Sequence, residues 1–191
     1  MARYIVDSQM ENHEKYYFIR EVESQDIVLL PTKYLMHKKR SRLSPNTVRR
    51  SAGAISYYLN YLDEYSLRLD DIWEMKYDKQ QEHFTDYLIW LQAGLHSGDN
   101  LKKNPCNETC NAYLKEVFRF YGFAGRQDEP AKQLKVLSDM RIIVNNSVGV
   151  RRTIHRNSFH GYLQEKGHIG KTIEQDKIVR LLKACANCRD Q

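Results

Sequence analysis

The chain has 191 residues, enough for one or two small domains, and its 41% hydrophobic content is sufficient for a buried core. Its formal net charge of +6 favours a polyanionic partner. No apolar run approaches the roughly 20 residues of a membrane-spanning helix, and no basic-plus-apolar targeting segment opens the chain. We therefore expect a cytoplasmic protein with no membrane partner.

Charged residues are unevenly distributed along the chain. Residues 38–50 include six basic residues and no acidic one, and residues 141–171 include six basic residues and one acidic residue. Between them, residues 60–90 carry eight acidic and three basic residues. Two basic stretches separated by an acidic one predict a molecule with a cationic face and an acidic back.

The first thirty residues predict a small sheet or hairpin. Three β-rich runs, at residues 4–6, 16–19 and 27–30, are separated by polar residues. We expect Pro31 to end this β-rich segment and a short helix to follow it over residues 32–39.

A long helix is predicted from Pro45 to about Tyr65. Ser44 is a good N-cap, and proline is tolerated at the first helical position. Apolar residues recur at steps of four and three along one face, at Val48, Ala52, Ile55, Leu59 and Leu62. After this helix, a short connector carrying Ile72 and Trp73 is expected to pack on the core.

The start of this helix is a candidate phosphate site. A helix N-terminus favours anions, and this one is flanked by cationic side chains. The predicted DNA contacts are Thr47, Arg49 and Arg50, whereas residues 38–42 are interpreted as a solvated lead-in. The alternative for the whole segment is a solvated basic linker leading into an ordinary core helix.

Further helices are predicted downstream. Apolar spacing indicates helices at about 79–92 and 107–122, joined by a loop over residues 94–105. A fourth helix is expected to open at Glu129 and Pro130, with Leu134 and Leu137 facing inward. A last helix is expected from about Ile173, where Thr172 and Gln175 form a capping-box pattern.

Two more groups of cations are candidate DNA contacts. Lys115 and Arg119 are four residues apart and form a predicted basic ridge on the helix at 107–122. Arg151, Arg152 and Arg156 belong to a weakly patterned, basic region, and we expect them to track a phosphate backbone.

Catalytic and metal-site motifs are not found in the sequence. There is no nucleotide-binding glycine loop, no HExxH and no GxSxG. The thirteen tyrosines invite a nucleophile hypothesis, but no cluster of Arg and His accompanies any of them, so we interpret them as core or groove-edge residues. Four cysteines have spacings that permit a zinc site, yet the irregular first pair favours plain thiols, so no metal is predicted for Cys106, Cys110, Cys185 and Cys188.

Three segments resemble a known family. Residues 43–72, with their Ser-x-Asn-Thr start and apolar stripe, are similar to the first helix of the core-binding domain of tyrosine recombinases, which include phage integrases and mobile-element transposases. Residues 108–124 are similar to a later helix of that domain, with matches at Thr109, Asn111, Leu114, Val117, Phe120, Tyr121 and Phe123. Residues 171–190 resemble the opening of the family's catalytic domain.

The resemblance, which covers about residues 32–191, implies a mainly α fold. We expect a small β-rich N-terminal segment (1–31), a helical core-binding DNA-binding domain (32–165), and a linker with the first helix of a truncated catalytic domain (166–191). The implied function is binding of duplex DNA at a recombination site, with other recombinase protomers as further partners and no small-molecule substrate.

The resemblance also bears on catalysis. Full-length relatives cut and rejoin DNA through a phosphotyrosine intermediate, without a metal or nucleotide cofactor. Their catalytic residues lie in a part of the protein that would follow Gln191, so this chain by itself is expected to bind DNA without cleaving it.

Two other functional classes remain open at this stage. A helical protein-interaction module would dock a partner helix through its aromatic face. A helix-turn-helix regulator would need a tight turn between two helices, and the long loop before Asn107 argues against it.

Overall fold

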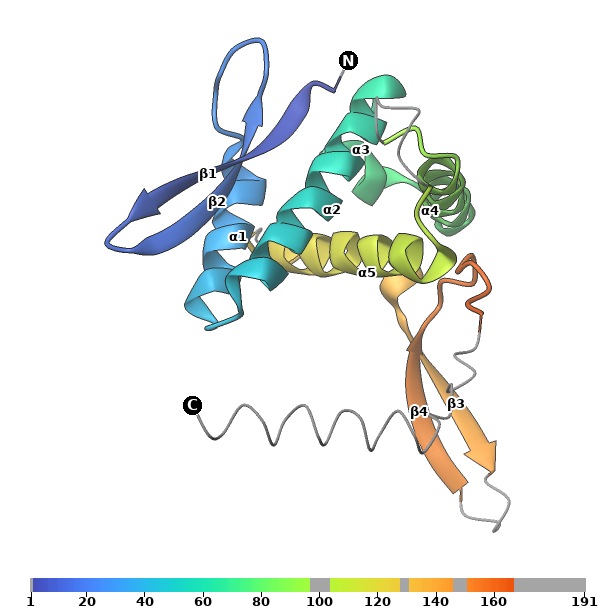
Figure 1. Cartoon of the computed structure of the whole chain (residues 1–191). Coiled ribbons are helices and arrows are strands. Elements are labelled where there is room, and N and C mark those ends of the chain that lie inside the picture. The colour runs from blue at the N-terminus through green and yellow to red at the C-terminus, as the bar shows by residue number, and fades with distance from the viewer. Residues whose placement is uncertain (1, 97–103, 128–130, 146–150, 167–191) are drawn as a thin grey trace, which may run out of the picture.

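The computed structural model describes residues 2–96, 104–127, 131–145 and 151–166. For residues 139–145 and 151–157 it describes the backbone only. The fold is mainly helical, with a small antiparallel sheet at the N-terminus, as predicted (Figure 1). The helices are α1 (Leu29–Arg40), α2 (Pro45–Glu64), α3 (Leu69–Glu74), α4 (Tyr77–Gln92) and α5 (Asn107–Ala124). The strands are β1 (Tyr4–Glu11), β2 (Glu14–Glu21), β3 (Asp139–Asn145) and β4 (Arg151–Asn157).

The N-terminal hairpin, β1 and β2, packs on α2. Its two-residue turn is formed by Asn12 and His13, which both adopt the positive φ that a tight hairpin turn requires. Tyr4 donates its backbone N–H to the Oδ1 of Asn60 at 2.8 Å, and Ile19 is fully buried. The hairpin is therefore part of the hydrophobic core that the helices share.

The expected third β-rich run is wrong in its second half. Ile27 forms an isolated bridge with Arg20, and the chain is helical from Leu29 onward. Pro31 does not end the segment, because it lies in the first turn of α1, where its missing N–H has no intrahelical partner to lose.

The predicted start of α2 is confirmed. The side chain of Ser44 accepts a hydrogen bond from the backbone N–H of Thr47 at 3.2 Å, and Pro45 is the first helical residue. The connector after α2 forms the short helix α3, whose Ile72 and Trp73 are buried as expected.

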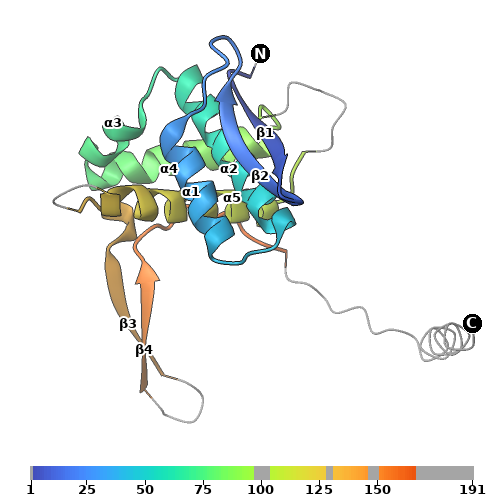
Figure 2. The same ribbon diagram turned by 90° about the vertical axis from the view of Figure 1, so that its left-hand side faces the viewer.

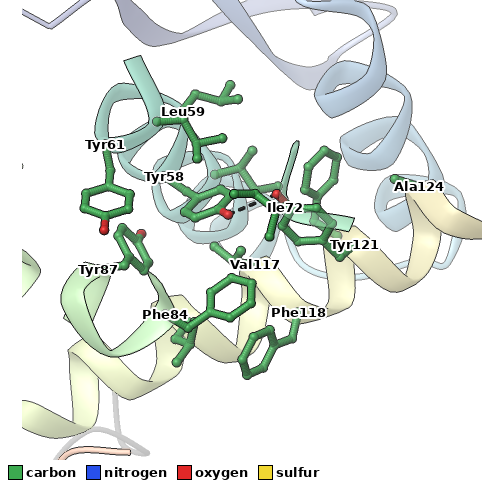
Figure 3. Close-up of a cluster of buried hydrophobic side chains, with 14 of the residues drawn as sticks. Tyr58, Leu59, Tyr61, Ile72, Phe84, Tyr87, Val117, Phe118, Tyr121 and Ala124 are labelled. Atoms are coloured by element: carbon green, nitrogen blue, oxygen red, sulfur yellow. Dashed lines mark hydrogen bonds between the residues drawn. The ribbon is translucent and has the colours of Figure 1, made fainter. Parts of the chain in front are cut away.

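Tyrosines fill the core between α2, α4 and α5 (Figure 3). Tyr58, Tyr87 and Tyr121 are fully or almost fully buried. The Tyr58 hydroxyl lies 3.0 Å from that of Tyr121 and 2.8 Å from Nε2 of His83. Burial lowers the pKa of His83 to about 4, so the ring is neutral at pH 7 and serves this buried hydrogen-bonded network.

The region after α5 differs from the prediction. Leu134 is buried, but it precedes a 3₁₀ turn (Lys135–Leu137) and strand β3, in place of the expected fourth helix. After this turn, the β-branched run Ile142, Ile143 and Val144 pairs antiparallel with β4, as residues of this type favour a strand. The helix expected from Ile173 lies outside the described residues.

Within the described residues, no helix combines the length and the apolar character that crossing a membrane requires.

Candidate nucleic-acid interface

An open groove of about 530 Å³ lies where the end of α1, the start of α2 and one side of α5 meet. It brings together Thr47 and Arg119, two predicted contacts from different helices. Its lining also includes His37, Lys38, Glu116 and Arg126. The groove thus collects cations around the N-terminus of a 20-residue helix.

The start of α2 presents its polar groups to solvent. Thr47, Arg49 and Arg50 are exposed, and the first turn of α2 contains no acidic residue. Because the first N–H groups of a helix lack intrahelical partners and carry partial positive charge, an anion is stabilised there. The structure therefore places the three predicted residues on one accessible helix end.

The floor of the groove is a buried ionic cluster, called here the Glu116 cluster, formed by Tyr34, Lys38, Ser51 and Glu116. Lys38 is 8% exposed and Glu116 is 6% exposed. The ammonium of Lys38 donates to the Glu116 carboxylate and, at 2.7 Å, to Oγ of Ser51. The Tyr34 hydroxyl donates to Oε1 of Glu116 at 2.7 Å.

These contacts keep Glu116 ionised. Burial alone would raise the pKa of Glu116, but the hydrogen bonds from Lys38 and Tyr34 and the charge of Lys38 outweigh it and hold the pKa below its usual value. Lys38 neutralises the acid internally, so Glu116, the one acidic side chain among the described residues that line the groove, presents little net negative charge to a ligand.

The interpretation of residues 38–42 as a solvated lead-in is therefore wrong for its first two members. Lys38 is buried in the Glu116 cluster. Lys39 lies 2.7 Å from the carboxylate of Glu14 and over the ring of Tyr16, so it joins α1 to the N-terminal hairpin. Arg40 and Arg42 remain exposed.

The predicted ridge on α5 is present, and its two cations have different neighbours. Arg119 donates to Oε2 of Glu116 at 3.1 Å, yet its side chain is 67% exposed and borders the groove. Lys115 lies 3.7 Å from the carboxylate of Glu165 and near the ring of Tyr162. Arg119 therefore faces the groove at α2, whereas Lys115 borders the returning chain after β4.

The three predicted arginines of the second basic stretch are on strand β4, where a weakly patterned linker was expected. In the register of the hairpin, Arg151 is opposite Asn145, Arg152 is opposite Val144 and Arg156 is opposite Met140. The structure describes only the backbone of these three residues. The hairpin and the α1–α2 connection nevertheless lie on the same side of α5, the lower side in both views (Figures 1 and 2).

Two groove residues were missed by the sequence reasoning. Arg126 lies in the 3₁₀ turn (Gly125–Gln127) that follows α5, seven residues after Arg119. That spacing is two helical turns, so the pair was detectable as one cationic stripe. His37 packs against Phe123, with ring centroids 5.1 Å apart. Only the tertiary fold shows that His37 also lines the groove.

Neither the two most deeply buried tyrosines nor the described metal-ligating residues form a catalytic arrangement. Burial holds the pKa of Tyr58 and Tyr87 well above its usual range, so neither hydroxyl is an accessible nucleophile. Among the described residues, no group of three or more His, Cys, Asp or Glu side chains is arranged to hold a metal ion. Cys106 is exposed and Cys110 is buried, and Cys185 and Cys188 lie outside the described residues.

Most residues that carry the recombinase resemblance on α5 are structural. Leu114, Val117, Phe120, Tyr121 and Phe123 are all buried. Asn111 is also buried: it donates to the carbonyl of Leu163 at 2.8 Å and accepts the N–H of Leu163 at 3.0 Å, which holds the returning chain on α5. No family model, curated protein or solved structure matches this chain.

Proposed function

We propose that the chain binds duplex DNA through a basic face made of the α1–α5 groove and the start of α2. The residues expected to contact phosphates on this face are Thr47, Arg49, Arg50, Arg119 and Arg126. The observation that carries the proposal is the groove itself. The exposed cations Arg119 and Arg126 line it together with Thr47 from the first turn of α2, and Glu116, the one acidic residue in the part of the lining that the structure describes, is neutralised by a buried lysine.

The distribution of charge supports a specific face over a uniformly basic protein. The acidic stretch of residues 60–90 forms the end of α2 together with α3 and α4. A long-range field of this kind orients a polyanion toward the basic side during encounter. DNA bound at the groove would therefore lie away from the eight acidic residues of this stretch.

Within this proposal, the chain is the core-binding part of a tyrosine recombinase of the mobile-element type. The motif resemblance and the mainly helical fold support that assignment. The chain then contributes DNA binding and contacts with other protomers on DNA, and strand cleavage belongs to the catalytic domain of full-length relatives.

The structure argues against the rival role as a protein-interaction module with an aromatic docking face. That role needs exposed rings, but most of the large aromatic residues of α2, α4 and α5 are buried in the core, among them Tyr58, Tyr61, Phe84, Tyr87 and Phe120. Their burial in the core accounts for the aromatic content of these helices.

The test is a fluorescence-anisotropy titration of a labelled 30-base-pair duplex between about 50 and 200 mM salt. Four arginines on the basic face predict a log–log salt slope of about −3 or steeper. The double variant Arg49→Ala/Arg50→Ala is expected to bind more weakly on every sequence, with a slope shallower by about 2.

The matched control is Lys76→Ala/Lys79→Ala, which removes the same charge from exposed positions at the start of α4, within the acidic stretch. This control should bind like the wild-type chain, apart from a small change due to net charge. Absence of binding at low salt, or a slope near zero, would refute the proposal.

A further inference from the structure

The β3–β4 hairpin is anchored to the core at its base. On the β4 side, the carbonyl of Ser158 accepts hydrogen bonds from the Tyr77 hydroxyl at 2.8 Å and from Nε2 of Gln81 at 2.9 Å. The next residue, Phe159, is buried against Phe118, with ring centroids 5.4 Å apart. These contacts fix the return of the hairpin on α4 and α5.

The β3 side is anchored in the same way. Val136 is fully buried, and its backbone N–H donates to Oε1 of Gln80 at 3.2 Å. Gln80 is itself fully buried and donates to the carbonyl of Ile72 at 2.8 Å. Because both ends of the hairpin are held by α4, its direction relative to the helices is set by the core.

Beyond this base, the hairpin leaves the helical body (Figures 1 and 2). Within the described residues, neither strand makes an extensive contact with a helix, and each strand pairs mainly with the other. An isolated two-stranded ribbon is marginally stable in water. A ribbon held out in this way, with β-branched residues at 142–144 and 153–154, is therefore typical of an element that a partner completes.

The charge of the ribbon indicates the class of that partner. Residues 139–157 contain four arginines and one aspartate. Since neighbouring strand residues alternate between faces, Arg152 and Arg156 belong to one face of the ribbon, with Ile154 between them, and Arg151 belongs to the other. An arginine–aliphatic face of this kind matches a polyanion that also presents apolar groups.

We propose that the β3–β4 ribbon enters the major groove of the duplex held by the basic face and contacts base edges there; this proposal rests on the DNA-binding function proposed above. Two strands about 4.8 Å apart fit a groove about 12 Å wide, whereas the minor groove is only about 6 Å wide. Arginine pairs with guanine O6 and N7, and aliphatic side chains contact the thymine methyl group. The ribbon would therefore supply sequence preference, and the helical face would supply phosphate contacts.

The experiment compares two double variants that remove equal charge. A preferred duplex is first selected from a randomised library with the wild-type chain, and guanine N7 protection on it is then measured with dimethyl sulfate. Arg152→Ala/Arg156→Ala is compared with the control Lys76→Ala/Lys79→Ala. The melting temperature of each protein is recorded, and it should not change for the ribbon variant because the mutated positions lie outside the helical core.

The proposal predicts that the wild-type chain and the control protect guanines of the selected duplex. The ribbon variant should lose this protection, and its preference for the selected duplex over a random one should fall by about tenfold or more. If the wild-type chain binds DNA with no N7 protection, or if the ribbon variant protects like the control, the ribbon proposal is wrong and the DNA-binding function stands. If the wild-type chain does not bind duplex DNA at all, both proposals fail.

Discussion

Two buried polar clusters in this molecule compensate the burial of polar side chains in different ways. In the core, Tyr58, His83 and Tyr121 form a network of neutral groups joined by hydrogen bonds. Beneath the basic groove, the Glu116 cluster buries a charged pair, Lys38 with Glu116. The neutral network avoids the cost of burying a charge, whereas the ionic cluster needs every partner to offset it.

Of the two clusters, only the ionic one contacts a residue of the proposed DNA-binding face. The neutral network lies in the core between α2, α4 and α5 and serves packing. The ionic cluster binds Arg119 through the second oxygen of Glu116 and so connects the core to an exposed groove cation. Because the charge of Glu116 is balanced by Lys38, Glu116 can hold Arg119 at the groove without repelling a phosphate.

The largest expected effect comes from breaking the ionic cluster. Glu116→Gln leaves the Lys38 ammonium buried without its counter-charge, and we expect the free energy of unfolding to fall by about 3–5 kcal/mol at pH 7. Urea unfolding followed by circular dichroism measures this change. A loss below about 1 kcal/mol would show that Lys38 reaches water easily and that the cluster is not a buried pair.

A second, smaller effect is the pH dependence of the free energy of unfolding, which differs between the two clusters. The pKa of His83 falls from 6.5 to about 4 on folding, so the unfolded chain binds a proton that the folded chain excludes. Stability should therefore decrease as pH falls from about 6.5 to 4, by about 3 kcal/mol in total.

The variant His83→Gln should flatten that part of the pH profile, as measured by urea unfolding at several pH values. Glu116 acts at lower pH. Because folding lowers its pKa below 4.5, its stabilisation is present above that pH and is lost as pH falls further. If His83→Gln loses stability between pH 6.5 and 4 as steeply as the wild-type chain, the neutral network does not depend on an uncharged His83.

The start of α2 could be predicted from sequence because its signals are local. Ser44, Pro45 and the apolar stripe lie within a few turns of one another. The partner of Lys38, in contrast, is 78 residues away, and nothing near Lys38 in the sequence reveals that it is buried. Lys38 was expected at the surface, and it is a core residue because of its distant partner Glu116.

For a different reason, the β3–β4 hairpin was not predicted. Strand β4 is rich in arginine and lacks a continuous apolar pattern, so it is recognisable as a strand only through its pairing with β3. The resemblance to recombinases says little about the DNA contacts of this chain. On α5 it rests mainly on core residues such as Leu114 and Tyr121, which bear on the fold more than on the contacts with DNA.

The most direct test of the central claim is hydrogen–deuterium exchange of the chain with and without a 30-base-pair duplex at low salt. We expect slower exchange on DNA binding in peptides that cover residues 41–50 and 115–127, with no change in peptides that cover α3 and α4. Protection confined to α3 and α4, or no protection anywhere under conditions in which the duplex is bound, would contradict a DNA-binding face at the start of α2 and along α5.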